Sequence, residues 1–196
     1  MATGNNKRFF ADPVAYIKTH QLLINPQAVG SQVLKAGKMN LDFVSIDPQN
    51  PAFIRMEDYD KRSHSKGAAP IAAYFLPAVV DDTSTLDIDI DFNRSYMFTA
   101  DLSGCLFAAY GNDASRITVE HVNVRTANAR VNIAARAQAI IAAGYGYYRI
   151  LSPKAIPQSN PQYVKSYDAT SSVVGIRTGA GWSFYYKPEM YEIAKL

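Results

Sequence analysis

Short apolar or alternating runs fill the middle of the chain and predict β-strands. Six of them span residues 41–47, 70–80, 85–92, 96–102, 105–111 and 117–124. Asn, Asp, Gly, Pro and Ser separate these runs, which is the composition of turns. Two further runs, 171–179 and 181–187, meet at a glycine-rich junction and predict a hairpin. The pattern therefore predicts a strand-rich protein.

Two proline-marked N-caps predict short helices near the start of the chain. Asp12 precedes Pro13 and Asn25 precedes Pro26. A side-chain oxygen at the N-cap followed by proline at the first helical position is a typical helix start. We therefore predict two short helices between residues 12 and 37.

One stronger helix is predicted late in the chain. Residues 127–143 are rich in alanine, and Gly144 follows them as a helix stop. Helices at the start, strands in the middle and one late helix indicate the α+β class. We predict a sandwich of mixed, mostly antiparallel β-sheets flanked by helices.

The composition fits one globular domain spanning residues 1–196. Of the 196 residues, 48% are hydrophobic and 19% are charged, which is enough apolar material for a substantial core. The net charge of +3 comes from scattered Lys and Arg, so no nucleic-acid groove is expected. A single cysteine excludes an internal disulfide. No secretory signal and no membrane-spanning run are found, so a soluble protein is expected.

No metal site is predicted. Residues 87–91 carry aspartate at alternate positions, but they lack the glycine and glutamate of a calcium loop. The intervening positions are apolar, so we interpret this run as a half-buried strand with its acids in water. The three histidines are scattered along the chain, and one cysteine cannot build a zinc site of usual spacing.

The single cysteine, Cys105, follows a turn and opens a strand. Ser103 and Gly104 interrupt two apolar runs just before it, and glycine permits a sharp corner there. A nucleophile needs such a corner, because it must face a pocket and still be held firmly. A lone cysteine beside a strand is also often a buried structural residue. Both interpretations remain open from these residues.

His121 is the candidate partner of the thiol. Alternation along residues 117–124 places it on the same face as Ile117 and Val119, where a histidine is either a core residue or a catalytic base. Pairing of this strand with residues 105–111 would bring His121 towards Cys105. A free thiol has a pKa of about 8.5, so an adjacent imidazolium would be needed to form thiolate at neutral pH.

These residues resemble a known toxin superfamily. The sequence Leu102-Ser103-Gly104-Cys105, followed by a strand and then His121, is similar to the catalytic core of the cytotoxic necrotizing factor and Burkholderia lethal factor toxins, which are glutamine deamidases. The similarity covers mainly residues 96–124.

Three further features bear on this resemblance. Thr99, six positions before Cys105, matches a threonine that the lethal factor places before the same motif. Residues 173–187 resemble that toxin's closing strands more weakly. The sixteen positions from Cys105 to His121 exceed the spacing of the lethal factor and are close to that of the necrotizing factors.

The resemblance implies a function and a set of roles. Cys105 would be the nucleophile, His121 its partner and Thr99 an orienting residue, with the Ser103-Gly104 turn supplying the oxyanion site. No metal or organic cofactor is implied. The substrate would be a glutamine side chain of a eukaryotic host protein, such as a small GTPase or a translation factor. The toxin would be a monomer made in the bacterial cytoplasm without a cleavable signal, and it would act in the host cytosol.

Two other classes of function use the same residues differently. A cysteine protease or a transglutaminase would form the same acyl-enzyme on Cys105 and differ in what enters and leaves. A non-catalytic binding module would keep Cys105 as a structural core residue.

Overall fold

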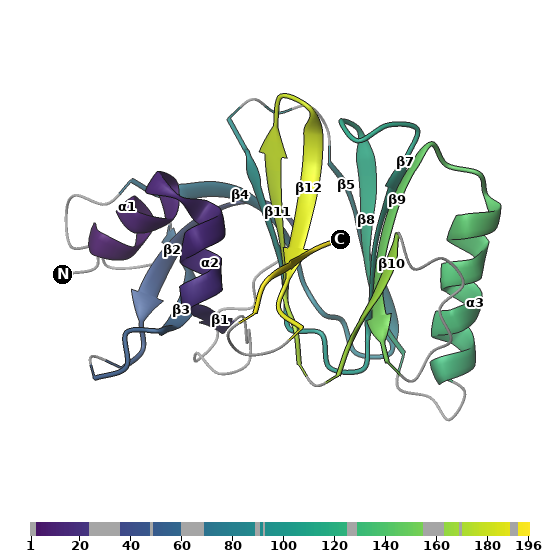
Figure 1. Cartoon of the computed structure of the whole chain (residues 1–196), viewed down its shortest axis with the longest axis horizontal. Helices are drawn as coiled ribbons and strands as arrows, with labels where there is room; N and C mark the ends of the chain where they lie inside the picture. The colour runs from purple at the N-terminus through teal and green to yellow at the C-terminus, as the bar shows by residue number, and fades with distance from the viewer. Residues whose placement is uncertain are drawn as a thin grey trace.

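Two β-sheets pack face to face, and helices cover both outer faces (Figure 1). This computed structural model describes residues 3–23, 36–47, 49–59, 69–88, 91, 93–124, 129–154, 163–168, 170–188 and 192–196. None of the helices in this described part has the length and hydropathy of a membrane span.

The larger sheet, in the described residues, has eight strands in the order β1-β3-β2-β4-β6-β11-β12-β13. The strand bounds are β1 (Gln21–Leu23), β2 (Gly37–Ser45), β3 (Phe53–Asp58), β4 (Ile71–Leu76), β6 (Tyr96–Thr99), β11 (Val173–Thr178), β12 (Gly181–Tyr186) and β13 (Ala194–Lys195). Its neighbouring strands are antiparallel except in the β1–β3 and β4–β6 pairs.

The smaller sheet carries the candidate site. Within the described ranges its five strands lie in the order β10-β9-β7-β8-β5. Their bounds are β5 (Asp82–Ile88), β7 (Leu106–Gly111), β8 (Ile117–Asn123), β9 (Tyr147–Pro153) and β10 (Val164–Tyr167). Only the β9–β10 pair is parallel among these strands. Because β7 and β8 are interior strands, each is paired on both sides.

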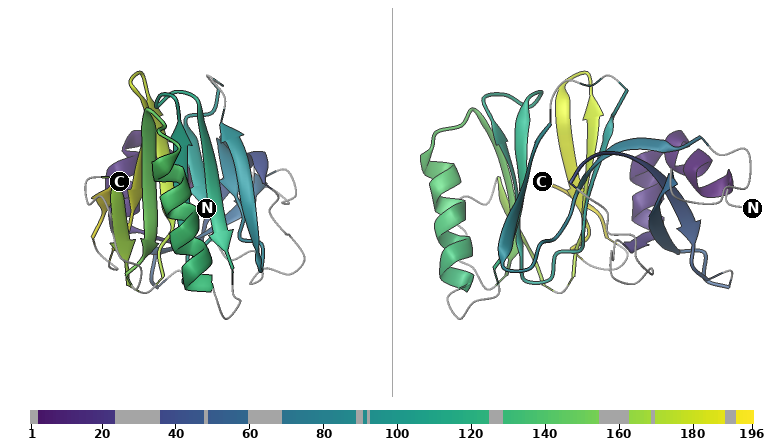
Figure 2. Two further views of the ribbon diagram at one scale, coloured as in Figure 1. Left: turned by 90° about the vertical axis from the view of Figure 1, so that its right-hand side faces the viewer. Right: turned by 180° about the vertical axis from the view of Figure 1, so that it is seen from behind.

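Three helices complete the layers. α1 (Thr3–Ala11) and α2 (Pro13–Thr19) cover the outer face of the larger sheet, and α3 (Ala129–Ala142) covers the outer face of the smaller one (Figure 2). The Asp12 side chain accepts a hydrogen bond from the Ala15 amide at 2.9 Å, as the sequence predicted for this N-cap. The four layers are therefore helices, sheet, sheet and helix.

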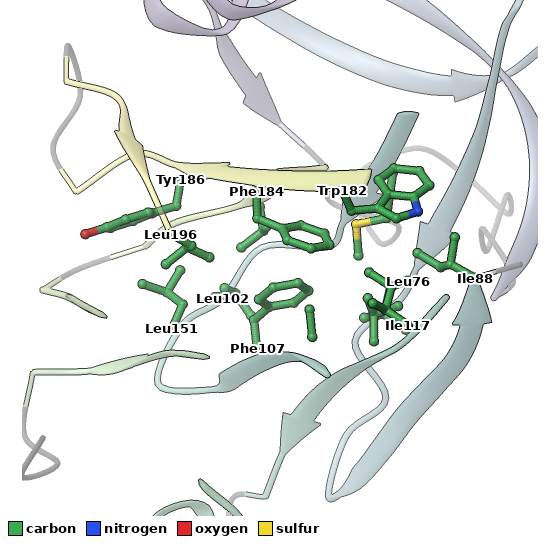
Figure 3. Close-up of a cluster of buried hydrophobic side chains, with 14 of the residues drawn as sticks. Leu76, Ile88, Leu102, Phe107, Ile117, Leu151, Trp182, Phe184, Tyr186 and Leu196 are labelled. Atoms are coloured by element: carbon green, nitrogen blue, oxygen red, sulfur yellow. The ribbon is translucent and has the colours of Figure 1, made fainter. Parts of the chain in front are cut away.

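The main core lies between the two sheets. Phe184 on β12 and Phe107 on β7 point towards one another with ring centroids 5.3 Å apart (Figure 3). Leu76, Leu151 and Trp182 extend the same cluster (Figure 3). Burial of this apolar surface is the main force that holds the two sheets together.

The predicted α+β sandwich is confirmed, with differences at particular elements. The hairpin of β11 and β12, the late helix and the strand pair β7–β8 are all found. The strand predicted over 70–80 ends at Leu76, just before Pro77, because proline cannot donate to a sheet ladder. α1, β1, β3, β10 and β13 were not predicted. The helix predicted to start at Asn25 lies outside the described residues.

The acidic run at residues 87–91 is consistent with a surface strand end. The described strand β5 spans Asp82–Ile88, so it begins earlier than the predicted start at residue 85, and residues 89, 90 and 92 of the prediction lie outside the described residues. The Asp87 carboxylate accepts a hydrogen bond from the Thr118 hydroxyl at 2.7 Å. Asp91 forms ion pairs with Lys38 and Arg94, and Asp89 lies outside the described residues.

Candidate active site

The turn before the cysteine is sharply bent and anchored on one side. The Leu102 amide donates to the Ser171 carbonyl at 2.6 Å, and the Ser171 amide donates back at 3.1 Å. Gly104 has φ +80°, a left-handed conformation that other residues adopt only with strain. Ser103 and Gly104 are exposed, whereas Cys105 is buried. The predicted corner at this motif is therefore present, and its geometry requires glycine.

Cys105 faces the space between the two sheets. It belongs to the same buried cluster as Phe107 and Ala109, which alternate with the outward-facing residues of β7. The side chain is only 3% exposed. Its sulfur lies 3.8 Å from the Ser103 carbonyl, to which the thiol can donate a weak hydrogen bond. Access of a substrate to this thiol requires local opening.

His121 shares this inner face. The antiparallel pairing of β7 and β8 sets Phe107 opposite His121, and Cys105 is two residues before Phe107. Cys105 and His121 are therefore diagonal neighbours on one face of the sheet. Such diagonal positions are about 7–8 Å apart at the backbone, within reach of long and aromatic side chains. The strand pairing predicted from the sequence is thus found, and it places the two residues on the same face of the sheet.

The imidazole of His121 is buried without compensation. The residue is 0% exposed, and neither ring nitrogen has a hydrogen-bond partner among the described residues. Burial lowers the pKa of His121 to about 4, because a charged ring would lose its hydration. The ring is therefore neutral at pH 7. The sequence argument expected an imidazolium beside the thiol, whereas burial favours the neutral form of this ring.

This burial predicts an acid-sensitive fold. The ordinary pKa of 6.5 applies in the unfolded chain, so the unfolded state binds the proton first as the pH falls. Stability should be complete above pH 6.5 and fall as the pH drops to about 4, by about 3 kcal/mol from this group. Urea unfolding at several pH values measures the effect. His121→Gln should remove this part of the pH dependence, and an unchanged profile in that variant would refute the assignment.

Thr99 also faces the space between the sheets, from the larger sheet. Thr99 is the last residue of β6 and lies two positions after Met97, so the two side chains share one face of the strand. Met97 belongs to the buried cluster between the sheets. Its hydroxyl accepts a hydrogen bond from the Val173 amide at 2.9 Å, so it joins the ends of β6 and β11. The hydroxyl still has its own hydrogen to donate. A role in orienting His121 remains a prediction beside this structural one.

Thr99→Val tests the structural role with almost no change in volume. The substitution removes the acceptor of the buried Val173 amide, so we expect the free energy of unfolding to fall by about 1–3 kcal/mol. Chemical denaturation measures this loss. An unchanged midpoint would show that the Val173 amide does not depend on this hydroxyl.

The structure adds Tyr167 to the neighbourhood of the thiol. Its hydroxyl donates to the Cys105 carbonyl at 2.6 Å, and burial raises the pKa of this phenol above its usual range. Tyr167 lies on β10, which pairs in parallel with β9. The sequence held no signal for this contact. A short turn predicts an antiparallel hairpin, but no comparable local pattern predicts a parallel strand pair.

The described pockets lie away from the thiol. A pocket of about 370 Å³ is lined by residues that include Asp87, Tyr110 and Arg116. It lies at the end of β7 opposite to Cys105, because Tyr110 is next to the last residue of that strand. Cys105 lines neither of the two described pockets.

Comparisons with known proteins give a fold and no sequence relative. The sequence matches no protein-family model and no curated protein. The structure is similar to the C-terminal domain of CNFy from Yersinia pseudotuberculosis, with a TM-score of 0.53 and 10% identity. The similarity covers 100% of this chain and 97% of that chain. The chain therefore shares the fold of the C-terminal domain of a cytotoxic necrotizing factor.

Proposed function

We propose that this protein is a toxin that converts a glutamine of a host protein into glutamate, with Cys105 as nucleophile and His121 as base. The observation that carries the proposal is the fully buried imidazole of His121, which has no hydrogen-bond partner in the described structure and lies diagonal to the thiol. The shared fold with the CNFy domain supports the same assignment.

A purely structural histidine would be unfavourable at this position. Burying a polar group without a hydrogen bond costs free energy, and most buried polar atoms in proteins are therefore paired. On its own strand face, Ile117 and Val119 are apolar, whereas Asn123 is a second buried polar residue. An apolar residue at position 121 would avoid the cost of an unpaired imidazole. A chemical role explains why an imidazole is kept there.

The first step is acylation of the thiol. The Cys105 sulfur attacks the carboxamide carbon of the glutamine, and the neutral His121 ring takes the thiol proton as the S–C bond forms. The imidazolium then gives this proton to the departing nitrogen, the C–N bond breaks, and ammonia leaves. A neutral base suits this step, because it can accept the proton directly. Backbone amides of the turn at Ser103 and Gly104 are the nearest candidates to hold the oxyanion.

The second step is hydrolysis of the thioester. Water loses a proton to His121 and attacks the thioester carbon, and the C–S bond breaks. The proton returns to the sulfur of Cys105, which restores the starting thiol and imidazole. The products are glutamate and ammonia, so the target protein gains one negative charge at neutral pH.

The surroundings of Cys105 favour a side-chain amide over a peptide bond. A protease commonly binds its substrate as an extended strand along an exposed sheet edge. β7, which Cys105 precedes, is paired with β8 on one side and β9 on the other. No free edge of β7 is available for an added strand. A buried thiol at this position is better approached by one long side chain from a folded protein.

Exposure of a eukaryotic cell lysate to the protein tests the proposal. The wild type and a Cys105→Ser variant are incubated with equal samples, and peptides are compared by mass spectrometry. We expect glutamine-to-glutamate conversion at one or a few sites in the wild-type sample alone. New peptide termini would instead indicate proteolysis, and amine adducts would indicate transglutamination. The absence of any change dependent on Cys105 would reject the enzymatic function.

A further inference from the structure

Ser84 on β5 lies directly opposite His121. β5 and β8 are antiparallel neighbours, and their register sets Ser84 directly opposite His121. Residues directly opposite in such a pair have Cβ atoms about 4.5–5.5 Å apart. Alternation places Ser84 on the same face of β5 as Ile88, which belongs to the cluster between the sheets. The Ser84 side chain therefore shares a face with His121, on the strand away from β7.

The hydroxyl and the ring are both buried and both without partners. Ser84 is 7% exposed, and its oxygen has no hydrogen-bond partner among the described residues. The two ring nitrogens of His121 have none either. Buried polar atoms are nearly always paired, so two adjacent side chains lacking partners need a common explanation. A serine hydroxyl changes its direction by rotation about a single bond, so Ser84 is the residue of the pair that can turn towards the ring.

We propose that Ser84 is the positioning residue of this site, its hydroxyl accepting a hydrogen bond from one ring nitrogen of His121 so that the other nitrogen is presented to Cys105. The inference rests on the proposed function, because it assigns the third group of the same pair. The positions of the two residues support it. β8, which carries His121, lies between β5, which carries Ser84, and β7, which Cys105 directly precedes. A base that is held by a third group is the usual arrangement for an activated nucleophile.

The hydrogen bond selects one state of the ring. A neutral imidazole carries its hydrogen on one nitrogen, and an acceptor at that nitrogen fixes the tautomer. When His121 takes the thiol proton, the hydrogen bond to Ser84 is retained and stabilises the cation. Besides Cys105, the titratable side chains of the cluster are Tyr74, Tyr147, Tyr167 and Tyr186, and burial raises the pKa of the last three, which favours their neutral form. Among the described residues, burial is the cause that lowers the pKa of His121.

The reactivity of Cys105 towards iodoacetamide tests the inference without a known substrate. Its rate is measured from pH 5 to pH 9 in the wild type and in Ser84→Ala, Ser84→Thr and His121→Gln. We expect Ser84→Ala to lower the rate at pH 7 by about 10-fold and to shift the pH midpoint. Ser84→Thr keeps the hydroxyl and should restore the wild-type profile.

A neighbouring residue supplies the matched control. Thr83→Ala removes a hydroxyl from the adjacent position of β5, whose side chain is exposed, and should leave the profile unchanged. Thermal unfolding of Ser84→Ala should give a lower midpoint, because the variant leaves one buried ring nitrogen of His121 without its acceptor. A merely structural role of Ser84 would lower the midpoint as well, but it predicts faster alkylation of a loosened site, whereas the positioning role predicts slower alkylation.

The outcomes separate this inference from the proposed function. If His121→Gln changes the profile and Ser84→Ala does not, Ser84 is no positioning residue and the inference fails alone. If His121→Gln leaves the profile unchanged, the thiol–imidazole pair itself is rejected, and the inference fails with it. A lower rate in both variants, with rescue by Ser84→Thr, supports both.

Discussion

Cys105→Ser is expected to abolish glutamine deamidation and to leave the fold intact. The alcohol is a much weaker acid than the thiol, and the neutral His121 ring cannot generate an equivalent nucleophile from it. We expect the rate to fall by about 1,000-fold or more. The exchange of sulfur for oxygen changes the side-chain volume little, so the thermal unfolding midpoint should stay close to that of the wild type. Conversion of a glutamine peptide identified in the lysate measures the activity.

Loss of folding in Cys105→Ser would favour a structural role of Cys105. A thiol whose only role is to fill the core stabilises the fold through packing. A hydroxyl buried in its place without a hydrogen bond would lower the free energy of unfolding. A variant that is insoluble, or that unfolds without cooperativity, would therefore favour the structural interpretation of Cys105. A variant that is folded and fully active would reject Cys105 as the nucleophile.

His121→Gln is expected to remove activity nearly as completely. Both steps of the proposed reaction need a group that takes and returns a proton, and a glutamine side chain cannot do so. We expect a loss of about 100- to 10,000-fold, as is typical for general bases. Glutamine is preferred to alanine here because it keeps most of the volume and leaves a smaller cavity in the core.

A second histidine in the described structure supplies the control for this variant. His20 follows α2 and stacks on Tyr16 with ring centroids 3.9 Å apart, on the outer side of the larger sheet. Burial lowers its pKa as well. His20→Gln should therefore leave deamidation unchanged. Equal losses in the two variants would show that activity responds to general destabilisation and not to the base at position 121.

The local part of the site could be predicted because sequence neighbours determine it. Gly104 marks a turn, and the structure gives it the positive φ that favours glycine. Strict alternation predicted that His121 faces the core side of its strand, and the short connection after Gly111 predicted the β7–β8 hairpin. Together these two local rules place Cys105 and His121 on one face.

The remaining contacts could not be predicted because they join segments far apart in the sequence. Tyr167 contacts the Cys105 carbonyl although it lies sixty-two residues later in the chain. Its strand, β10, pairs in parallel with β9, and no local sequence pattern predicts such a pair. Ser84 reaches His121 through the register of β5 on β8, which depends on long-range pairing. The low pKa of His121 depends on the depth of burial, which alternation alone does not give. These features are properties of the packed sandwich.

The most direct test of the central claim is the mass of a susceptible target protein after reaction in water labelled with oxygen-18. Hydrolysis of a thioester on Cys105 puts one solvent oxygen into the new carboxylate. The account predicts release of ammonia and a gain of about three daltons at one glutamine, in place of about one dalton in ordinary water. Cys105→Ser should show no gain in either solvent. Chain fragments, a stable amine adduct or an unchanged mass with the wild-type protein would contradict the account.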